Sequence, residues 1–536
     1  MTTHEVSNQA PPLHDYDLAH ADPILLGAVS EGADWAIPKL IEFGRGVATA
    51  ESYQWAADAN RYPPKLRTHD AYGHRIDQVD FHPAWHQLMD RAVGQGLHSL
   101  PWESTTQPGG HLARAGFAFL DNQVEAGHLC PIAMTYAVVP ALAHNPQLAE
   151  TWNPRILTRS YDPAFAPMEK KTGVLLGMGM TEKQGGSDVR SSTTRAEPVA
   201  DGYRVLGHKW FTSAPMNDAF LILAQAPRGL SCFLLPRHLP DGSVNEIRIV
   251  RLKDKLGNRS NASAELEFEG ALAQLVGEEG RGVATIIEMV NGTRLDCIIG
   301  SAGLMRQAVS QAIHHCRHRR VFGGALLEKP AMINVLADLE VETEAAVLLM
   351  ARVAQSFDRS EDDREQSLRR LVTPVAKFVV TKRCTEVVHE ALECLGGNGY
   401  VEESIMPRLL RESPLNAIWE GSGNVIALDV LRAVRTHPDS VKVLEEEVSG
   451  LDERIDAAAR STFDLLFDLD EPESQARLVT ERLGAILQGA LLIKSAGAEV
   501  ADAFIATRLD GGGGRFYGTL PHTAGLSSIV ERAIPA

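Results

Sequence analysis

The chain has 536 residues, of which 44% are hydrophobic and 23% are charged, so it can bury a large core spread over several domains. Its formal net charge of −17 disfavours partners that carry many negative charges, such as duplex DNA, unless a local basic patch overrides it. No apolar run approaches the length that spans a membrane, no secretory signal is visible at the N-terminus, and the six cysteines include no CxxC pair. We therefore expect a cytoplasmic protein without a membrane segment, a disulfide framework or a metal site.

The first 172 residues carry a helical pattern over most of their length. Residues 1–50 are mixed and are expected to wrap over other elements, whereas apolar residues recur at spacings of three and four between about 50 and 170. Pro140, Pro146 and Pro154 are expected to lie in loops between short helices.

A change of pattern at residue 173 predicts a β domain over residues 173–284. Short runs rich in apolar and β-branched residues, such as AFLILAQAP, alternate there with turns rich in Gly, Pro and Asn. Helical patterns return over 285–436, with a charged break at 356–367, and again over 437–536, where DGGGGR is expected to form a loop. Because the strands are consecutive, this order favours a β domain inserted between helical domains over a doubly wound dinucleotide-binding fold. The fold class is therefore α+β and mainly α.

The stretch Trp419-Glu420-Gly421-Ser422-Gly423-Asn424 places one carboxylate between a large aromatic residue and a flexible turn. Removal of such a carboxylate from water raises its pKa toward that of a useful general base. The small residues after it let a cofactor or a backbone approach closely. An ordinary glutamate in a surface turn explains the same stretch about equally well.

A second candidate stretch, Met178 to Asp188 (MGMTEKQGGSD), follows a strand-like run. Thr181 and Ser187 offer hydroxyl groups, and Gly185 and Gly186 offer accessible N–H groups that suit an anionic diphosphate. For this motif alone, a Gly-Gly hairpin turn is the better explanation.

Seven short motifs follow one another along the chain: MTEKQGGSDV at 180–189, GHKWFTS at 207–213, KLGNRS at 255–260, GEEGRG at 277–282, RRVFG at 319–323, GGNGY at 396–400 and WEGSGN at 419–424. In sequence and order they resemble the motifs of the acyl-CoA dehydrogenase superfamily. The run RLKDKLGNRSNAS and the long C-terminal extension further resemble its alkylation-response members, which are associated with DNA binding and only weak dehydrogenation of short branched acyl-CoA.

The resemblance implies a fold and an assembly. A helical N-terminal domain (1–172), a middle β-barrel domain (173–284) and a C-terminal four-helix bundle (285–436) would precede a helical extension (437–536). FAD would lie between the β domain and the bundle, and the protein would be a homotetramer built as a dimer of dimers. This fold agrees with the α–β–α order of the patterns above.

The resemblance also implies which residues bind FAD. These would be Met178, Met180, Thr181, Gly186, Ser187, Phe211, Thr212, Ser213, Phe322, Ser422 and Asn424, together with Arg319, Gly396 and Gly397, which would meet a neighbouring subunit's FAD. An ungapped match places Phe211 against the flavin and Trp210 on the opposite side of the strand. A solvated charge at a helix end explains Arg319 as well, because its surroundings, HHCRHRR, are basic throughout.

By the same resemblance, Glu420 would remove the α-proton of an acyl thioester while a hydride leaves the β-carbon for the flavin. The Glu420 N–H and a flavin hydroxyl would hold the thioester oxygen and stabilise the developing enolate. The other position at which the family places its base matches Thr293, which has no carboxylate. Arg294 is either a neighbour of the base or a charge at a helix end. Trp419, in place of the usual Tyr, is expected to narrow the acyl pocket, and Glu393 adds a negative charge before GGNGY.

Three functions compete at this stage. The first is an FAD enzyme that dehydrogenates a short or branched acyl-CoA and passes electrons to an electron-transfer flavoprotein or another acceptor. The second is a DNA-associated alkylation-stress protein with little or no dehydrogenase activity, which predicts a basic C-terminal face. Residues 437–536 contain 9 Lys and Arg against 17 Asp and Glu, a net charge of −8, and this balance disfavours DNA. The third is a catalytically silent scaffold, which the presence of Glu420 argues against.

Overall fold

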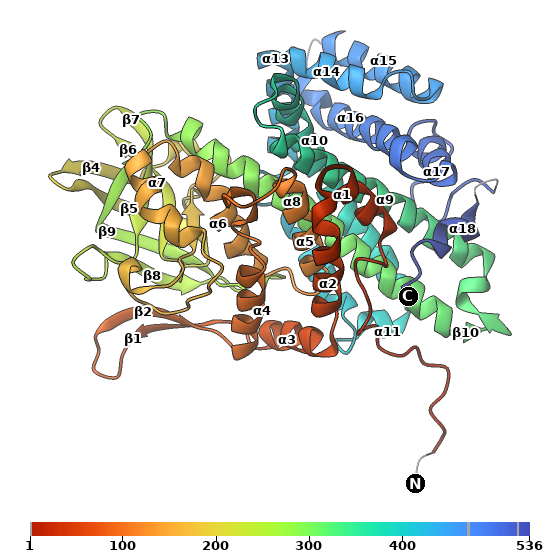
Figure 1. Ribbon diagram of the computed structural model, residues 1–536, viewed down its shortest axis with the longest axis horizontal. Helices are drawn as coiled ribbons and strands as arrows, with labels where there is room; N and C mark the ends of the chain where they lie inside the picture. The colour runs from red at the N-terminus through yellow and green to blue at the C-terminus, as the bar shows by residue number, and fades with distance from the viewer. Residues whose placement is uncertain (1–2, 469–471, 523–524, 536) are drawn as a thin grey trace. The chain divides into compact units, whose positions relative to one another are not determined.

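The computed structural model describes residues 3–468, 472–522 and 525–535, in the order helices, strands, helices (Figure 1). The chain divides into two compact units. The sheet unit comprises residues 51–106 and 125–293, and the bundle unit comprises residues 1–50, 107–124 and 294–536. The long helix α8 (Gly282–His318) contributes residues to both. This order confirms the predicted fold class.

Seven strands form the main sheet of the sheet unit: β3 (Leu176–Gly179), β4 (Arg195–Val199), β5 (Gly202–Ser213), β6 (Ala219–Ala226), β7 (Gly229–Pro236), β8 (Ile247–Leu252) and β9 (Ser263–Val276). Five of them close a ring, because β6 pairs with β4, β4 with β5, β5 with β9, β9 with β7, and β7 with β6. The ring is the expected barrel. Strand β3 pairs in parallel with the first half of β6, and β4 pairs in parallel with β6 near its end, at Gln225. Residues 180–194, which connect β3 to β4, therefore lie outside the sheet between these two pairings.

Burial of β6 on both faces explains why residues 219–224 are all apolar. Phe220, Ile222 and Ala224 point into the apolar core inside the ring. Leu221 and Leu223 point to the other face, where the apolar core includes residues of α6 (Leu129–Leu142) and α7 (Pro146–Ile156). A strand that is covered on both faces has no need of the polar alternation of a half-exposed strand.

The prediction of helices throughout 50–170 is wrong at one hairpin. Helices α3 (Ala50–Arg61) and α4 (Pro83–Gly94) flank two antiparallel strands, β1 (Lys65–His69) and β2 (Arg75–Asp80). The Asp70 side chain accepts hydrogen bonds from the backbone N–H groups of Tyr72 and His74 and so fixes the turn. These strands are rich in charged residues, and a count of apolar spacings gives no signal for them.

The prediction that prolines mark loops is also wrong at two positions. Pro140 lies inside α6 and Pro154 inside α7, whereas Pro146 begins α7. A proline has no N–H, so Pro140 leaves the carbonyl of Tyr136 without its usual helical donor. The indole Nε1 of Trp102 donates to that carbonyl at 3.0 Å, so the carbonyl keeps a hydrogen-bond donor.

The bundle unit contains all the remaining long helices. They are α1 (Pro23–Ala33), α2 (Ile37–Val47), α5 (Gly110–Asn122), α9 (Pro330–Asp358), α10 (Asp363–Cys394), α13 (Gly423–Thr436), α14 (Asp439–Val448), α15 (Glu453–Asp468), α16 (Pro472–Ser495) and α17 (Ala498–Arg508). Helix α9 packs against α5, α10 and α16, and α16 also packs against α13 and α15 (Figure 1). The break between α9 and α10 falls inside the predicted charged segment, and DGGGGR lies in a loop as expected.

Four acidic residues of α9, at every second position from 338 to 344, are buried: Asp338, Glu340, Glu342 and Glu344. We call them the carboxylate row. An arginine from another helix or from the C-terminal segment reaches each of them. Arg306 of α8 bonds Glu340 at 2.6 Å, Arg383 of α10 bonds Glu342 at 2.9 Å, Arg508 of α17 bonds Asp338 at 2.5 Å, and Arg532 bonds Glu344 at 2.9 Å.

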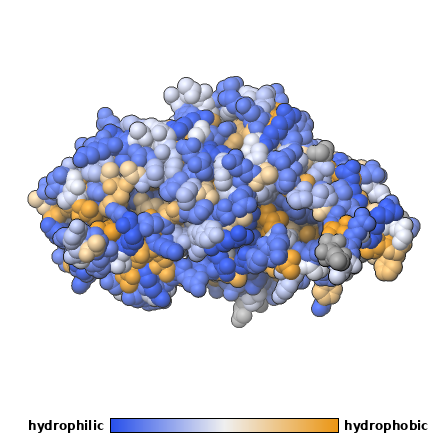
Figure 2. Space-filling model, turned by 90° about the horizontal axis from the view of Figure 1, so that it is seen from below, coloured by the Kyte–Doolittle hydropathy of each residue, from blue (hydrophilic) through white to orange (hydrophobic). Residues whose placement is uncertain are grey.

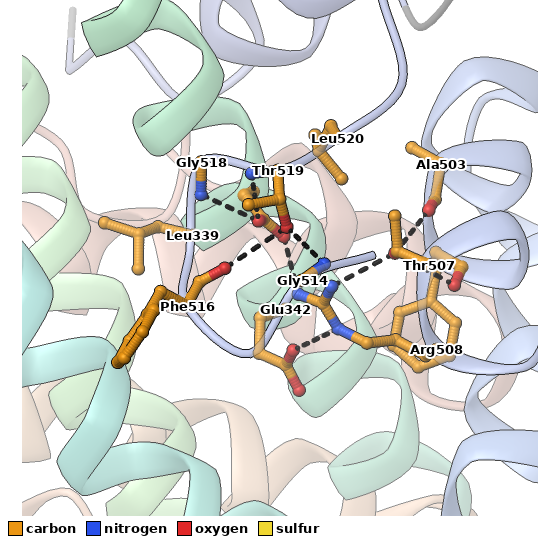
Figure 3. Close-up of polar contacts among 12 residues, drawn as sticks. Leu339, Glu342, Ala503, Thr507, Arg508, Gly514, Phe516, Gly518, Thr519 and Leu520 are labelled. Carbon is orange, nitrogen blue, oxygen red and sulfur yellow. Dashed lines mark hydrogen bonds and ion pairs between the residues drawn. The ribbon is translucent and has the colours of Figure 1, made fainter. Parts of the chain in front are cut away.

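The C-terminal extension is fastened to α9 at this row (Figure 3). Arg508 bonds both Asp338 and Glu342, and the second oxygen of Asp338 accepts from the backbone N–H groups of Gly518 and Thr519 at 2.9 and 3.4 Å. The loop after α17 is therefore held at its base by an acid of the bundle.

The domain boundaries at 172, 284 and 436 stay predictions.

Hydrophilic residues cover most of the face in Figure 2, and hydrophobic residues gather there in separate patches. Within the described residues, no helix combines the length and the apolar character needed to cross a membrane.

Candidate active site

The turn that carries Glu420 lies in the bundle unit, between the helical turn Leu415–Ala417 and the start of α13. Glu420 has a φ of +57° and Gly421 a φ of +111°. The left-handed region costs a residue other than glycine roughly 1–2 kcal/mol. At Gly421 the φ of +111° favours glycine, and a Cβ atom there would also press on Ile426 Cδ1 at 2.9 Å. Strained backbone of this kind persists where the surrounding structure holds it.

Two buried cations hold the turn through its backbone. Arg294 of α8 donates from Nε to the carbonyl oxygen of Glu420 at 3.2 Å and from Nη1 to Asp429 at 2.7 Å. Lys377 of α10 donates from Nζ to the carbonyl oxygen of Gly421 at 2.5 Å. Arg294 therefore lies beside Glu420 and within α8 rather than at a helix end, whereas nothing in the sequence singled out Lys377. The role of Glu420 as a base stays a prediction.

The groups around the turn influence one another electrostatically. Burial raises the pKa of the Cys297 thiol to about 12, and the charges of Lys377 and Glu420 act on it in opposite directions. Burial also lowers the pKa of Lys377 to about 8, although Cys297 and Glu420 favour its charged form. Glu420 itself is half-buried. The turn thus combines a partly accessible carboxylate with a nearby buried ammonium group.

The residues before Glu420 are fixed unequally. Trp419 is half-buried and its Nε1 donates to Asn416 at 2.9 Å, while Ile418 is exposed. After Glu420, Ser422 and Asn424 are exposed at the N-terminus of α13, which suits contact with a polar or anionic group.

In the sheet unit, the Thr293 hydroxyl donates to the carbonyls of Met289 and Val290 in its own helix. It is thus a poor alternative base.

The predicted flavin segment ends strand β5 in the sheet unit. A bulge interrupts the pairing with β9 between Lys209 and Thr212. The expectation that Trp210 and Phe211 face opposite sides is therefore wrong, and both rings lie near Lys253 Nζ, with centroids 3.4 and 4.6 Å away. Phe211 is 52% exposed, although it is a large apolar residue.

Next to this ring, the buried Thr212 Oγ1 has no hydrogen-bond partner among the described residues. Ser213 Oγ lies 3.2 Å from Ser263 Oγ. An uncovered aromatic ring beside two hydroxyl groups suits a flat ring system with polar edges, such as an isoalloxazine.

The Met178–Asp188 stretch follows β3 and is folded onto β5. Thr181 accepts a hydrogen bond from the Trp210 N–H at 2.8 Å, and its Oγ1 lies so close to Gly186 that a Cβ there would clash. Gly185 has a φ of +145° and Ser187 is exposed, so the turn presents backbone and hydroxyl groups to solvent. Met178 instead lies in the apolar core, against which Met180 packs.

The motifs expected to serve a neighbour's FAD meet the N-terminal arm of the chain, at Asn8 and Gln9. Arg319 donates to the carbonyl of Asn8 at 2.5 Å, and the Asn8 side chain exchanges two hydrogen bonds with the Arg320 backbone. Gln9 lies 3.4 Å from the Asn398 side chain.

Three other residues of these motifs have free space around them. Phe322 is 97% exposed, and a Cβ atom at Gly396 or Gly397 would meet no atom within 4 Å. The arm thus connects the two motifs, and their cofactor role stays a prediction.

Comparisons with known proteins agree over most of the chain. Residues 8–163 match the model of the adaptive response protein AidB N-terminal domain, residues 177–271 the acyl-CoA dehydrogenase middle domain, and residues 280–435 the acyl-CoA dehydrogenase C-terminal domain. The chain is 47% identical to AidB of Escherichia coli (strain K12) over 519 residues, which cover 96% of this chain and 95% of that one. The chain belongs to the acyl-CoA dehydrogenase family.

Other members of the acyl-CoA dehydrogenase family support this assignment. Acyl-CoA dehydrogenase family member 11 of Caenorhabditis elegans is 33% identical over 515 residues, which cover 88% of this chain and 81% of that one. The crystal structure of C. elegans ACDH-11 in complex with C11-CoA has a TM-score of 0.87 and 30% identity, and the match covers 95% of this chain and 93% of that one. The resemblance inferred from the seven motifs is confirmed.

Proposed function

We propose that this family member is an FAD-dependent dehydrogenase of a short or branched acyl-CoA, with Glu420 as the base that removes the α-proton. The observation that carries the proposal is the held, left-handed turn that presents a half-buried Glu420 beside Lys377 and Arg294. The acyl-CoA ligand of the C. elegans structure supports a thioester substrate. The bulk of Trp419 supports a short or branched acyl group.

Several residues fit FAD. Phe211, with Thr212 and Ser213, would face the ring system, and Thr181, Gly186 and Ser187 would offer hydroxyl and N–H groups to polar edges and phosphates. Ser422 and Asn424 would contact it from the start of α13, and Met178 and Met180 would support the turn from the core side. When bound, FAD supplies the acceptor for the hydride of the β-carbon.

The chain's own part in the reaction is to bind, orient and deprotonate. Glu420 accepts the α-proton, and its backbone N–H holds the thioester oxygen as negative charge develops there. Arg294 and Lys377 keep the peptide groups of this turn in place, so that the carboxylate and the N–H address the same substrate.

The test is the substitution Glu420→Gln, which keeps the size of the side chain and removes the base. The purified wild type is expected to be yellow with bound FAD and to lose its flavin absorbance anaerobically with an active acyl-CoA. Glu420→Gln should retain FAD but bleach roughly 10²-fold or more slowly, which is the usual contribution of a positioned base.

The matched control is Glu445→Gln, at an exposed position of α14, which should bleach like the wild type. Bleaching of Glu420→Gln at the wild-type rate would show that the base lies elsewhere. A protein that neither contains FAD nor takes it up would contradict the cofactor assignment.

We further propose a homotetramer in which Arg319, Phe322, Gly396 and Gly397 contact a neighbour's FAD. The exposure of Phe322 and the open space at both glycines support a partner surface at these motifs. Light scattering of the FAD-loaded protein tests this arrangement, and a stable FAD-loaded monomer would contradict it. The electron acceptor would be an electron-transfer flavoprotein or a similar carrier.

The alternative function is a DNA-associated role in alkylation stress, and the match to the adaptive response protein AidB favours it. The net charge of −8 over residues 437–536 opposes tight duplex binding. We expect a Kd weaker than about 10⁻⁸ M at physiological salt, and a tighter value in a gel-shift titration would favour the alternative.

A further inference from the structure

We propose that Lys377 is a positioning residue for Glu420, whose ammonium group holds the Gly421 carbonyl and so keeps the carboxylate-bearing turn in its left-handed conformation. This inference rests on the proposed function, because it assigns Lys377 a part in the work of the same base.

Lys377 is unusual among the buried lysines of this protein. Lys209 is paired with Glu182 at 2.8 Å and Lys171 with Asp218 at 2.6 Å, so a carboxylate neutralises each of these ammonium groups. Lys377 is only 1% exposed, and its single hydrogen bond within the described residues goes to a backbone carbonyl. Burial of an ammonium group without a carboxylate partner is costly, so a purely structural role is a poor explanation for it.

The position of that carbonyl gives the lysine its effect. Gly421 has no side chain to restrict its backbone, and its φ of +111° is open to few other residues. Arg294 fixes the peptide group that follows Glu420, and Lys377 fixes the one that follows Gly421. Two successive peptide groups after Glu420 are thus each held by a cation, and loss of the second contact would leave the Gly421 carbonyl without its ammonium donor.

The charges around Lys377 make this contact sensitive to pH. The groups that act on it are Cys297 and Arg294 of α8, Glu420 of the turn and Lys382 of α10. Because burial lowers the pKa of Lys377 to about 8, its ammonium group loses its proton in mildly alkaline solution. A neutral amine forms a weaker hydrogen bond than an ammonium ion, so the turn should loosen as the pH rises through this value.

The experiment compares Lys377→Met, which removes the donor, with Lys377→Gln, which keeps a neutral donor, and with Lys442→Met at an exposed position of α14. Two readouts are used. The first is the rate of anaerobic bleaching at saturating acyl-CoA as a function of pH. The second is cleavage after Glu420 by a glutamate-specific protease, followed by mass spectrometry, which needs no turnover.

We expect Lys377→Met to bleach about tenfold or more slowly with FAD content and acyl-CoA affinity little changed, as for a misplaced catalytic group. The wild-type bleaching rate should decline above pH 8, and the rate of Lys377→Met should not show this decline. Its turn should be cleaved after Glu420 about tenfold faster, because the strained segment opens more often. Lys377→Gln should lie between it and the wild type, and Lys442→Met should match the wild type.

Failures of the two ideas are distinguishable. If Lys377→Met, or Lys377→Gln where the methionine variant does not fold, bleaches and is cleaved like the wild type, the role of Lys377 is overturned while Glu420 can still be the base. If none of the acyl-CoAs tested bleaches the flavin of the FAD-loaded wild type, the proposed function fails. The cleavage rates then still decide whether Lys377 holds the turn.

Discussion

Glu342 of α9 and Glu420 of the turn both lie beside two cations, but the cations act on different atoms. Arg383 and Arg508 donate to the carboxylate of Glu342, whereas Arg294 and Lys377 donate to backbone carbonyls of the turn. Burial alone would raise the pKa of Glu342, but attraction to the two arginines lowers it to about 2. Cations bonded to a carboxylate lock it in an ion pair, and cations bonded to the backbone orient the residue that carries it.

The largest expected effect that separates the two sites is on stability. Glu342→Gln leaves Arg383 and Arg508 without their charge partner and should lower the free energy of unfolding by about 3 kcal/mol, because a broken buried pair leaves uncompensated charge. Denaturant unfolding measures this loss. The flavin bleaching rate of the folded variant should stay at the wild-type value, the reverse of Glu420→Gln. A slow-bleaching Glu342→Gln of normal stability would remove the contrast.

The sequence predicted the overall fold, because that follows from strand order and from the family resemblance of the motifs. It left Arg294 open between a neighbour of Glu420 and a charge at a helix end. It did not predict Lys377, which interrupts an apolar stretch of α10 and meets the turn only through tertiary packing. The carboxylate row was equally hidden. In the run DLEVETE the acids alternate with other residues, and four charged residues in a predicted helix are usually exposed, yet α9 buries all four.

Within the carboxylate row, the pKa of Glu344 is shifted in the opposite direction to that of Glu342. Burial, and then repulsion by Glu340, raise the pKa of Glu344 to about 7 in spite of Arg532. The folded protein therefore holds this proton more tightly than the unfolded chain, and stability should fall as the pH rises from about 4.5 to 7. The low pKa of Glu342 instead costs stability only as the pH falls from about 4.5 toward 2.

Glu344→Gln should therefore flatten the loss of stability between pH 5 and pH 7.5 by about 2 kcal/mol. Unfolding midpoints of both proteins at the two pH values measure this difference. An unchanged slope would mean that Glu344 is already ionised throughout the range.

The smallest effect is expected at the neighbour of the base. Trp419 is held by Asn416 through its side chain and takes no part in the two backbone contacts of the turn. Trp419→Tyr should leave the bleaching rate with the best acyl-CoA within about threefold, because the base is untouched, and should widen the range of acyl groups accepted. Bleaching rates across a panel of acyl-CoA chain lengths test this. A fall as large as that of Glu420→Gln would show that the ring itself orients the carboxylate.

The carboxylate row of α9 also links the bundle to the order in which the chain is synthesised. Arg306 precedes the row, but Arg508 lies 166 residues after Glu342, and Arg532 lies 188 residues after Glu344. At a synthesis rate of roughly 5–20 residues per second, the last partner follows its acid by about 10–40 seconds. During that interval a packed α9 would bury acids without partners, so its final burial should wait for the extension. The C-terminal segment then acts as the clamp that completes the bundle.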